Sequence, residues 1–215
     1  MKNNYYILSV LLTAFALMIF TSCSDDNDET NPIGGGNAQL SMKVEGEAWT
    51  AAMTTLFTEE HETSELGEYY LVHINGSRII DKNSQTEDDL VETIGFYINI
   101  PASKFKSPKG TYPIILNDDE MGHAWAVFGS STDLRDTTTY ISGNQDSSGQ
   151  VVGSIEITDF ETGATHILGH PTGAEGYTKL VGKFNLDVFP MTGSGSKLKI
   201  TEGKFNLSDA ISIGW

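Results

Sequence analysis

The chain has 215 residues, of which 29 are acidic and 13 are lysine or arginine, so its formal net charge at pH 7 is −16. A surface this negative repels phosphate groups, which argues against a nucleic-acid-binding protein. Cys23 is the single cysteine, so the chain forms no internal disulfide and depends on a hydrophobic core for its stability.

The first 22 residues predict a lipoprotein signal peptide. An apolar run of 16 residues (5–20) follows Lys2 and leads into Thr21-Ser22-Cys23. A membrane-spanning helix needs about 20 residues, so this run is short for a permanent span and is typical of a cleaved signal. The junction resembles the lipobox of bacterial lipoproteins, which implies that Cys23 carries a diacylglycerol and becomes the first mature residue. The alternative is an uncleaved membrane anchor with a chance cysteine.

An acidic run follows the cysteine and resembles the export tag of Bacteroidota-type surface lipoproteins. This resemblance implies a lipid anchor in the outer membrane, with the protein facing the cell exterior. The residues that carry it are Ser24, Asp25, Asp26, Asp28 and Glu29.

The rest of the segment 23–38 predicts a flexible tether. It has no periodic apolar pattern, and it contains Pro32 and three consecutive glycines (34–36). Residues 39–215 then remain, which suits one domain with one hydrophobic core.

Alternation of apolar and polar residues predicts an all-β domain, an antiparallel β-sandwich or open barrel. The connections are too short for helical crossovers, so we expect antiparallel pairing. Single helical turns are expected only at 102–105 and 86–91. The predicted strands are 40–44, 49–57, 69–80, 94–100, 111–116, 123–128, 138–142, 154–158, 179–189 and 198–207, with a break at Glu202-Gly203.

Turn residues separate most of these strands, and two polar regions predict long loops. The loops are 58–68 and 129–150, and on a rigid sandwich such loops commonly carry recognition. The predicted turns are Glu45-Gly46, Asn75-Gly76, Pro108-Lys109-Gly110, Ser148-Gly149 and the segment 192–195.

The sequence Gly-Lys-Phe-Asn-Leu occurs twice, at 182–186 and 203–207. At this length the repeat predicts two neighbouring strands with similar packing requirements rather than a duplicated domain.

Several short motifs together resemble a family of Bacteroidota-type surface lipoproteins classed as a domain of unknown function. They are the lipobox, the turn Val-x-Gly-x-x-Trp-x-Ala at 44–51, the strand at 153–160 and the two Gly-Lys-Phe-Asn-Leu strands. The resemblance covers most of 40–207 and departs at 58–92 and 129–150. It implies a β-sandwich surface protein, and it implies no catalytic residue.

The sequence contains no motif for nucleophilic catalysis, because a Gly-x-Ser-x-Gly elbow is missing and the only thiol is expected to be lipidated. Its five histidines are His61, His73, His123, His166 and His170. The last two are four apart, but Gly169 and Pro171 argue against the helix that a zinc pair would need. We therefore expect no metal site and no cofactor.

The acidic run from Asn117 to Glu120 contains oxygen ligands that calcium accepts. It lacks the spacing of an EF-hand loop, so a solvated turn between two strands is the preferred interpretation, and calcium binding there stays open.

Aromatic residues are the better indication of ligand binding. Trp49 and Trp125 lie within alternating apolar strands, where the core is the expected place for an indole, whereas Trp215 is at the end of the chain. Trp125 and Trp215 are the candidate ligand-binding residues, because exposed aromatic rings can stack on sugars.

The leading functional hypothesis is a surface-anchored, non-enzymatic binding or interaction module whose ligand is a glycan, another envelope protein or a host molecule. The alternatives are an accessory glycan-active hydrolase, with two carboxylates from distant strands, and a purely structural envelope lipoprotein.

The lipid anchor gives the first prediction. Cys23→Ala should abolish acylation, because the acyl chains attach to the thiol of Cys23. Metabolic labelling with a clickable palmitate analogue measures this, and undiminished label on the variant would contradict the anchor.

Overall fold

The computed structural model describes residues 39–63, 67–81, 90–115, 122–133, 136–142, 150–167, 170–191, 196–207 and 211–214. The predicted signal peptide, Cys23, the acidic run and the tether lie outside these residues, as do Asn117–Glu120 and Trp215. Within the described residues the chain forms twelve strands, one short 3-10 turn and no α-helix, so the predicted all-β single domain is confirmed.

The strands follow the predicted alternation closely, although several are longer than expected. Their bounds are β1 Gln39–Val44, β2 Glu47–Thr50, β3 Met53–Thr63, β4 Gly67–Asp81, β5 Leu90–Pro101, β6 Gly110–Ile114, β7 Ala124–Asp133, β8 Asp136–Ile141, β9 Gly153–Ile167, β10 His170–Pro190, β11 Leu198–Asn206 and β12 Ile211–Gly214, with the 3-10 turn η1 at Ala102–Lys104 after β5.

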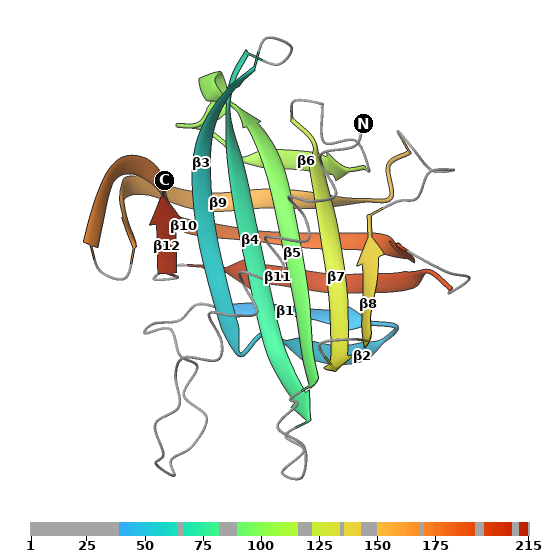
Figure 1. Ribbon diagram of the computed structural model, residues 1–215. Coiled ribbons are helices and arrows are strands. Elements are labelled where there is room, and N and C mark those ends of the chain that lie inside the picture. The colour runs from blue at the N-terminus through green and yellow to red at the C-terminus, as the bar shows by residue number, and fades with distance from the viewer. Residues whose placement is uncertain are drawn as a thin grey trace. The chain divides into compact units, whose positions relative to one another are not determined.

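The strands hydrogen-bond into one sheet in the order β12-β3-β4-β5-β7-β6-β9-β10-β11-β1-β2, and β8 pairs with both β7 and β10. Figure 1 shows that β3, β4, β5 and β7 form a front layer, whose strands cross those of a rear layer made of β9, β10, β11 and β1. Crossed layers that share one continuous sheet bury their two inner faces against each other.

The core fills the space between the two layers. β5 contributes Ile94, Phe96, Ile98 and Ile100, all with no exposed surface, and β10 contributes Leu180, Phe184 and Val188 from the opposite layer. The ring centroids of Phe96 and Phe184 are 4.4 Å apart, so these side chains join the layers directly.

The chain passes between layers at Ala51 and Ala52. The sequence predicts one strand at 49–57, but the structure has two strands in this region. β2 pairs with β1, and β3 pairs with β4. The N–H of Ala51 donates to Leu40 O and that of Ala52 donates to Ser77 O, so each alanine is bonded to a different layer. An apolar pattern does not reveal such a corner, because apolar residues continue through it from Ala51 to Met53.

The repeated Gly-Lys-Phe segments lie side by side, as predicted. In the antiparallel pair β10–β11, Gly182 faces Phe205 and Phe184 faces Gly203. A Cβ on either glycine would meet the facing phenylalanine ring closer than 3.0 Å. The predicted break at Glu202-Gly203 is a β-bulge, where Glu202 has φ +53° and the strand continues on both sides.

Three local expectations are wrong. Asn75-Gly76 is not a turn but lies inside β4, where a Cβ on Gly76 would meet Ala51 Cβ at 3.1 Å. The described residues of the predicted loops 58–68 and 129–150 are largely strands, since β3 continues to Thr63, β4 begins at Gly67, and β7 and β8 cover 129–133 and 136–141. Residues 143–149 of the second loop lie outside the described residues. In β3 polar residues lie on both faces, as with Thr58 and Glu59, and this hides the alternation.

Pairing is also not wholly antiparallel, because β12 pairs parallel with β3, and β6 meets β7 in parallel. β12 comes from far along the chain, so no hairpin dictates its direction.

The helical turn expected at 102–105 is confirmed. Of the turn expected at 86–91, residues 90 and 91 belong to β5 and the rest lies outside the described residues.

The glycine–phenylalanine packing predicts a specific double-mutant result. Gly203→Ala should destabilise the domain by about 1–3 kcal/mol, because all three nearest atoms to the new methyl belong to the Phe184 side chain. Phe184→Leu should relieve that clash, so the double variant should lose less free energy of unfolding than the two single losses added together. Urea denaturation measures this. Gly129→Ala is the control, since its Cβ finds nothing closer than 3.5 Å, and strict additivity would contradict the packing.

Candidate functional site

Four rings form a row across the outer face of the front layer. Phe57 on β3 pairs with His73 on β4, His73 pairs with Tyr97 on β5, and Tyr97 pairs with Trp125 on β7. Neighbouring ring centroids are 5.0 Å apart for Phe57–His73, 4.8 Å for His73–Tyr97 and 3.8 Å for Tyr97–Trp125. We call this set the aromatic row.

The register of the sheet produces the row. On β5 the even-numbered residues 94–100 enter the core, so Tyr97 points to the opposite side. Trp125 is likewise flanked by the buried Ala124 and Ala126, so its indole lies on the outer face and is partly exposed. The expected core position of Trp125 is therefore wrong, because both faces of this layer carry large apolar side chains.

The centre of the row is more enclosed than its ends. Tyr97 is 8% exposed and His73 is 7% exposed, whereas Phe57 and Trp125 are only partly buried. Burial raises the pKa of Tyr97 to about 12, so its hydroxyl stays neutral at all physiological pH values. Trp125 stacks on Tyr97 with an interplanar angle of 7°, which leaves the opposite indole face directed away from the row.

A carboxylate and two imidazoles adjoin the row on the same face. Glu59 Oε2 lies 2.9 Å from His61 Nε2 and 3.7 Å from His73 Nε2. His61 also stacks on Tyr69 at a centroid distance of 5.3 Å. The contact with His73 lowers the pKa of Glu59 most, burial opposes this shift, and His61 adds to it. We call these three residues the Glu59 triad.

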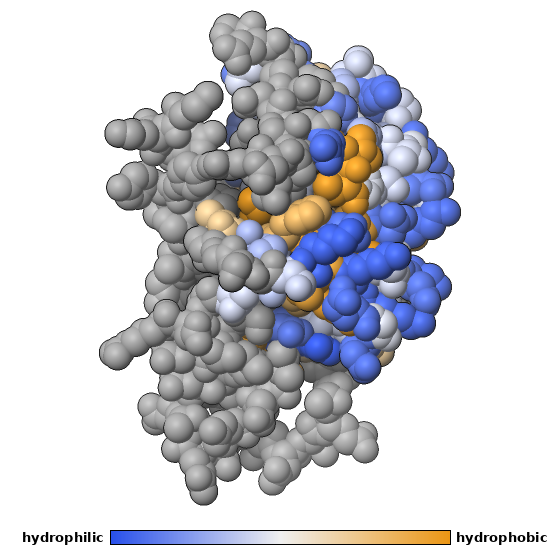
Figure 2. Space-filling model, turned by 90° about the vertical axis from the view of Figure 1, so that its right-hand side faces the viewer, coloured by the Kyte–Doolittle hydropathy of each residue, from blue (hydrophilic) through white to orange (hydrophobic). Residues whose placement is uncertain are grey.

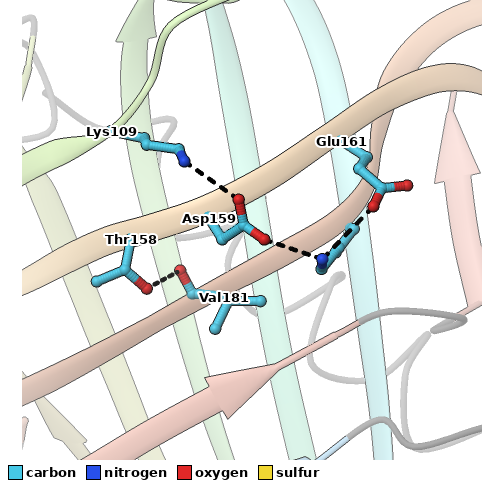
Figure 3. A network of polar contacts seen from close by, with 6 residues as sticks. Lys109, Thr158, Asp159, Glu161 and Val181 are labelled. Atoms are coloured by element: carbon cyan, nitrogen blue, oxygen red, sulfur yellow. Dashed lines mark hydrogen bonds and ion pairs between the residues drawn. The ribbon is translucent and has the colours of Figure 1, made fainter.

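The outer face of the rear layer is different in kind, because it carries ion pairs. Asp159 lies between Lys109 Nζ at 3.1 Å and Lys179 Nζ at 2.9 Å, and Lys179 also reaches Glu161 at 3.4 Å (Figure 3). The hydrogen bonds from Lys179 and Lys109 lower the pKa of Asp159 to about 2. Figure 2, seen from the right-hand side of Figure 1, shows hydrophilic residues over much of the described surface beside an apolar patch. The described ion pairs of the rear layer thus give its outer face a charged character.

Trp49 has a structural role, as predicted. Its indole is 1% exposed, and Nε1 donates to Glu92 Oε2 at 2.9 Å. Arg78 donates to the same carboxylate from Nε at 2.9 Å, and its guanidinium lies 5.5 Å from the Trp49 ring centroid. The polar groups of Trp49, Arg78 and Glu92 therefore bond to one another at one end of the core.

The other sequence candidates are dispersed. His123 precedes β7, and its backbone carbonyl accepts from Asn99 N–H on the outer face. His166 and His170 are in β9 and β10 near their hairpin, with side chains outside the described set. In the described part of the chain, no group of three or more His, Cys, Asp or Glu is arranged to hold a metal ion. Trp215 and the calcium candidate 117–120 lie outside the described residues.

Sequence reasoning missed the aromatic row and the Glu59 triad. The spacing of Phe57, Glu59 and His61, each two residues apart, is a strand-like signal that places them on one face. Their neighbours across the sheet depend on register, which the sequence does not reveal.

No family model, no curated protein and no solved structure matches the chain. Among the described residues there is also no helix with the length and apolar character needed to span a membrane.

The two described tryptophans predict contrasting stability effects. Trp49→Ala should cost about 3–5 kcal/mol of unfolding free energy, because it empties a core position and leaves Glu92 without its indole donor. Trp125→Ala should cost less, because its indole is partly solvated on the outer face. Denaturation of both variants measures the difference, and equal losses would place Trp125 in a structural role.

Proposed function

We propose that this protein is a surface-anchored lipoprotein whose domain acts as a non-enzymatic binding module. The junction at Cys23 and the acidic run after it support the anchor and its outward orientation on the outer membrane. The predicted tether 23–38 would hold the domain away from the lipid surface. The ligand is a glycan or an envelope protein.

The observation that carries the binding proposal is the aromatic row, with Trp125 at its partly exposed end. Trp125 and Tyr97 stack at 3.8 Å, so each ring fixes the other before a ligand arrives. A rigid indole loses little conformational entropy on binding, and its partly exposed surface suits stacking against the C–H face of a sugar or an apolar protein side chain. Glu59 and His61 lie on the same face and add polar groups for orientation.

The state of the carboxylates favours binding over hydrolysis. A glycosidase needs one carboxylic acid whose pKa is raised so that it can donate a proton. Glu59 and Asp159, the described carboxyl groups with a displaced pKa, are both displaced downward. Their partners stabilise the ionised form, which accepts hydrogen bonds and does not donate a proton.

The binding proposal is tested with the mature chain carrying Cys23→Ser, screened on a glycan array and in a pull-down of outer-membrane proteins. Trp125→Ala should weaken binding of the identified ligand about 5-fold to 100-fold, given about 1–3 kcal/mol for a lost aromatic stack. Trp125→Phe should retain part of the affinity. Val151→Ala is the control, since Val151 is a 66% exposed apolar residue that is not part of the row.

Each outcome decides between functions. Empty results in both screens would contradict the binding module, and unchanged affinity in Trp125→Ala would contradict the site. Release of reducing sugars from a polysaccharide would support the hydrolase instead.

A further inference from the structure

The Glu59 triad has a geometry that ordinary surface ion pairs lack. Two imidazole nitrogens, one from each of two neighbouring strands, approach the same carboxylate oxygen at 2.9 and 3.7 Å. The side chain of His73 is held in place by Phe57 at an interplanar angle of 83° and by Tyr97 at 68°. His61 is held by stacking on Tyr69.

The two nitrogens must carry protons for this arrangement to be stable. His73 Nε2 is buried, and among the described residues no group forms a hydrogen bond with it. A bare nitrogen lone pair facing a carboxylate at 3.7 Å would be repelled, whereas an N–H there is attracted. The contact of His61 Nε2 at 2.9 Å has hydrogen-bond length, so its nitrogen donates as well.

The more enclosed of the two imidazoles has the larger effect on the pKa of Glu59. His73 is the largest cause of the lowered pKa of Glu59, although His61 is closer. The side chain of His73 is 9% exposed and that of His61 is 38% exposed. Water screens the outer pair, so the enclosed imidazole interacts more strongly with the carboxylate.

Few other titrating groups face the triad from the elements around it. β4 presents Tyr69, β5 presents Tyr97, and His123 lies beyond β5 next to Asn99. Both tyrosine hydroxyls are neutral below pH 8. β7 presents Trp125, which does not titrate. The side chains of β12, on the other side of β3, are outside the described residues.

We propose that the Glu59 triad is a proton-linked clamp on the outer face of β3 and β4, which tightens when its histidines are protonated in mildly acidic surroundings and loosens when Glu59 is protonated. Histidine changes charge near pH 6.5 in the absence of neighbours. With both imidazoles protonated and Glu59 ionised, the clamp has one anion between two cations. The inference rests on the geometry of the triad and does not depend on the proposed ligand-binding function.

The lowered pKa of Glu59 determines the pH range in which its carboxylate stabilises the fold. A carboxyl group whose pKa is below its ordinary value of 4.5 in the folded state stabilises the fold above that pH. The stabilisation is lost as the pH falls through the lowered folded value. The clamp therefore weakens at pH values below the lowered pKa of Glu59.

The first test follows the Glu59 carboxyl carbon by NMR in the full mature chain as the pH is lowered. His73→Phe should raise the pKa of Glu59 towards 4.5, and His61→Phe should raise it by a smaller amount. Phenylalanine preserves the ring contacts with Phe57 and Tyr97, so the fold should survive. An ordinary Glu59 titration in the wild type, or an unchanged one in His73→Phe, would overturn the clamp.

The second test is a double-mutant cycle of Glu59→Gln and His73→Phe, with unfolding followed in urea at pH 5.5 and pH 8. The coupling between Glu59 and His73 is the factor by which the unfolding equilibrium constant of the double variant departs from the product of the two single effects. That factor should be about 3-fold to 10-fold larger at pH 5.5 than at pH 8. Glu60→Gln is the matched control, because Glu60 is an exposed neighbour on the same strand that alternates to the other face. Equal coupling at the two pH values, or the same effect from Glu60→Gln, would overturn the proposal.

Discussion

Two phenylalanine rings, each packed over a glycine of the neighbouring strand, determine how the rear layer fills its inner face. Phe205 covers Gly182 and Phe184 covers Gly203, in a nearly two-fold arrangement centred on the Lys183–Lys204 pair. Phe184 then reaches Phe96 on β5 at 4.4 Å. The approach of the two layers depends on this contact, because a side chain on either glycine would push a ring out of its place.

The front layer carries large side chains on both faces, and this is why it can combine a core with a candidate site. On β5, Phe96 and Ile98 fill the core while Tyr97 between them joins the aromatic row. Strand register determines which side chains are neighbours on the outer face. The core contacts that fix the register therefore also align Phe57, His73, Tyr97 and Trp125. The rear layer has one buried face only, and its outer face is held by lysine–carboxylate pairs.

Local pattern in the sequence was enough to predict most strands but not how they associate. The alternation at 179–189 and the repeated Gly-Lys-Phe segments led to the correct prediction of neighbouring strands. The turn predicted at Asn75-Gly76 is wrong. This dipeptide is typical of hairpin turns, but here it lies within β4, where Gly76 makes room for Ala51 and Leu40. The Glu59 triad was missed because His73 and Glu59 meet only through the β3–β4 register. Trp125 was identified as a candidate ligand-binding residue, yet its place at the end of a row depends on partners from three other strands.

The position of β1 in the sheet limits the order in which the strands can pair during folding. β1 lies between β2 and β11, and the Lys43–Glu202 ion pair joins residues 159 positions apart. The strand that begins the described domain therefore has no partner on that side until nearly all of the domain has been made. Contacts of such long sequence separation require a large loss of chain entropy before they are formed, so folding should be slow and should begin elsewhere, in the β3–β4–β5 meander. Until β11 has been made, one edge of β1 lacks its partner, so the domain cannot complete its sheet before its last strands have left the ribosome.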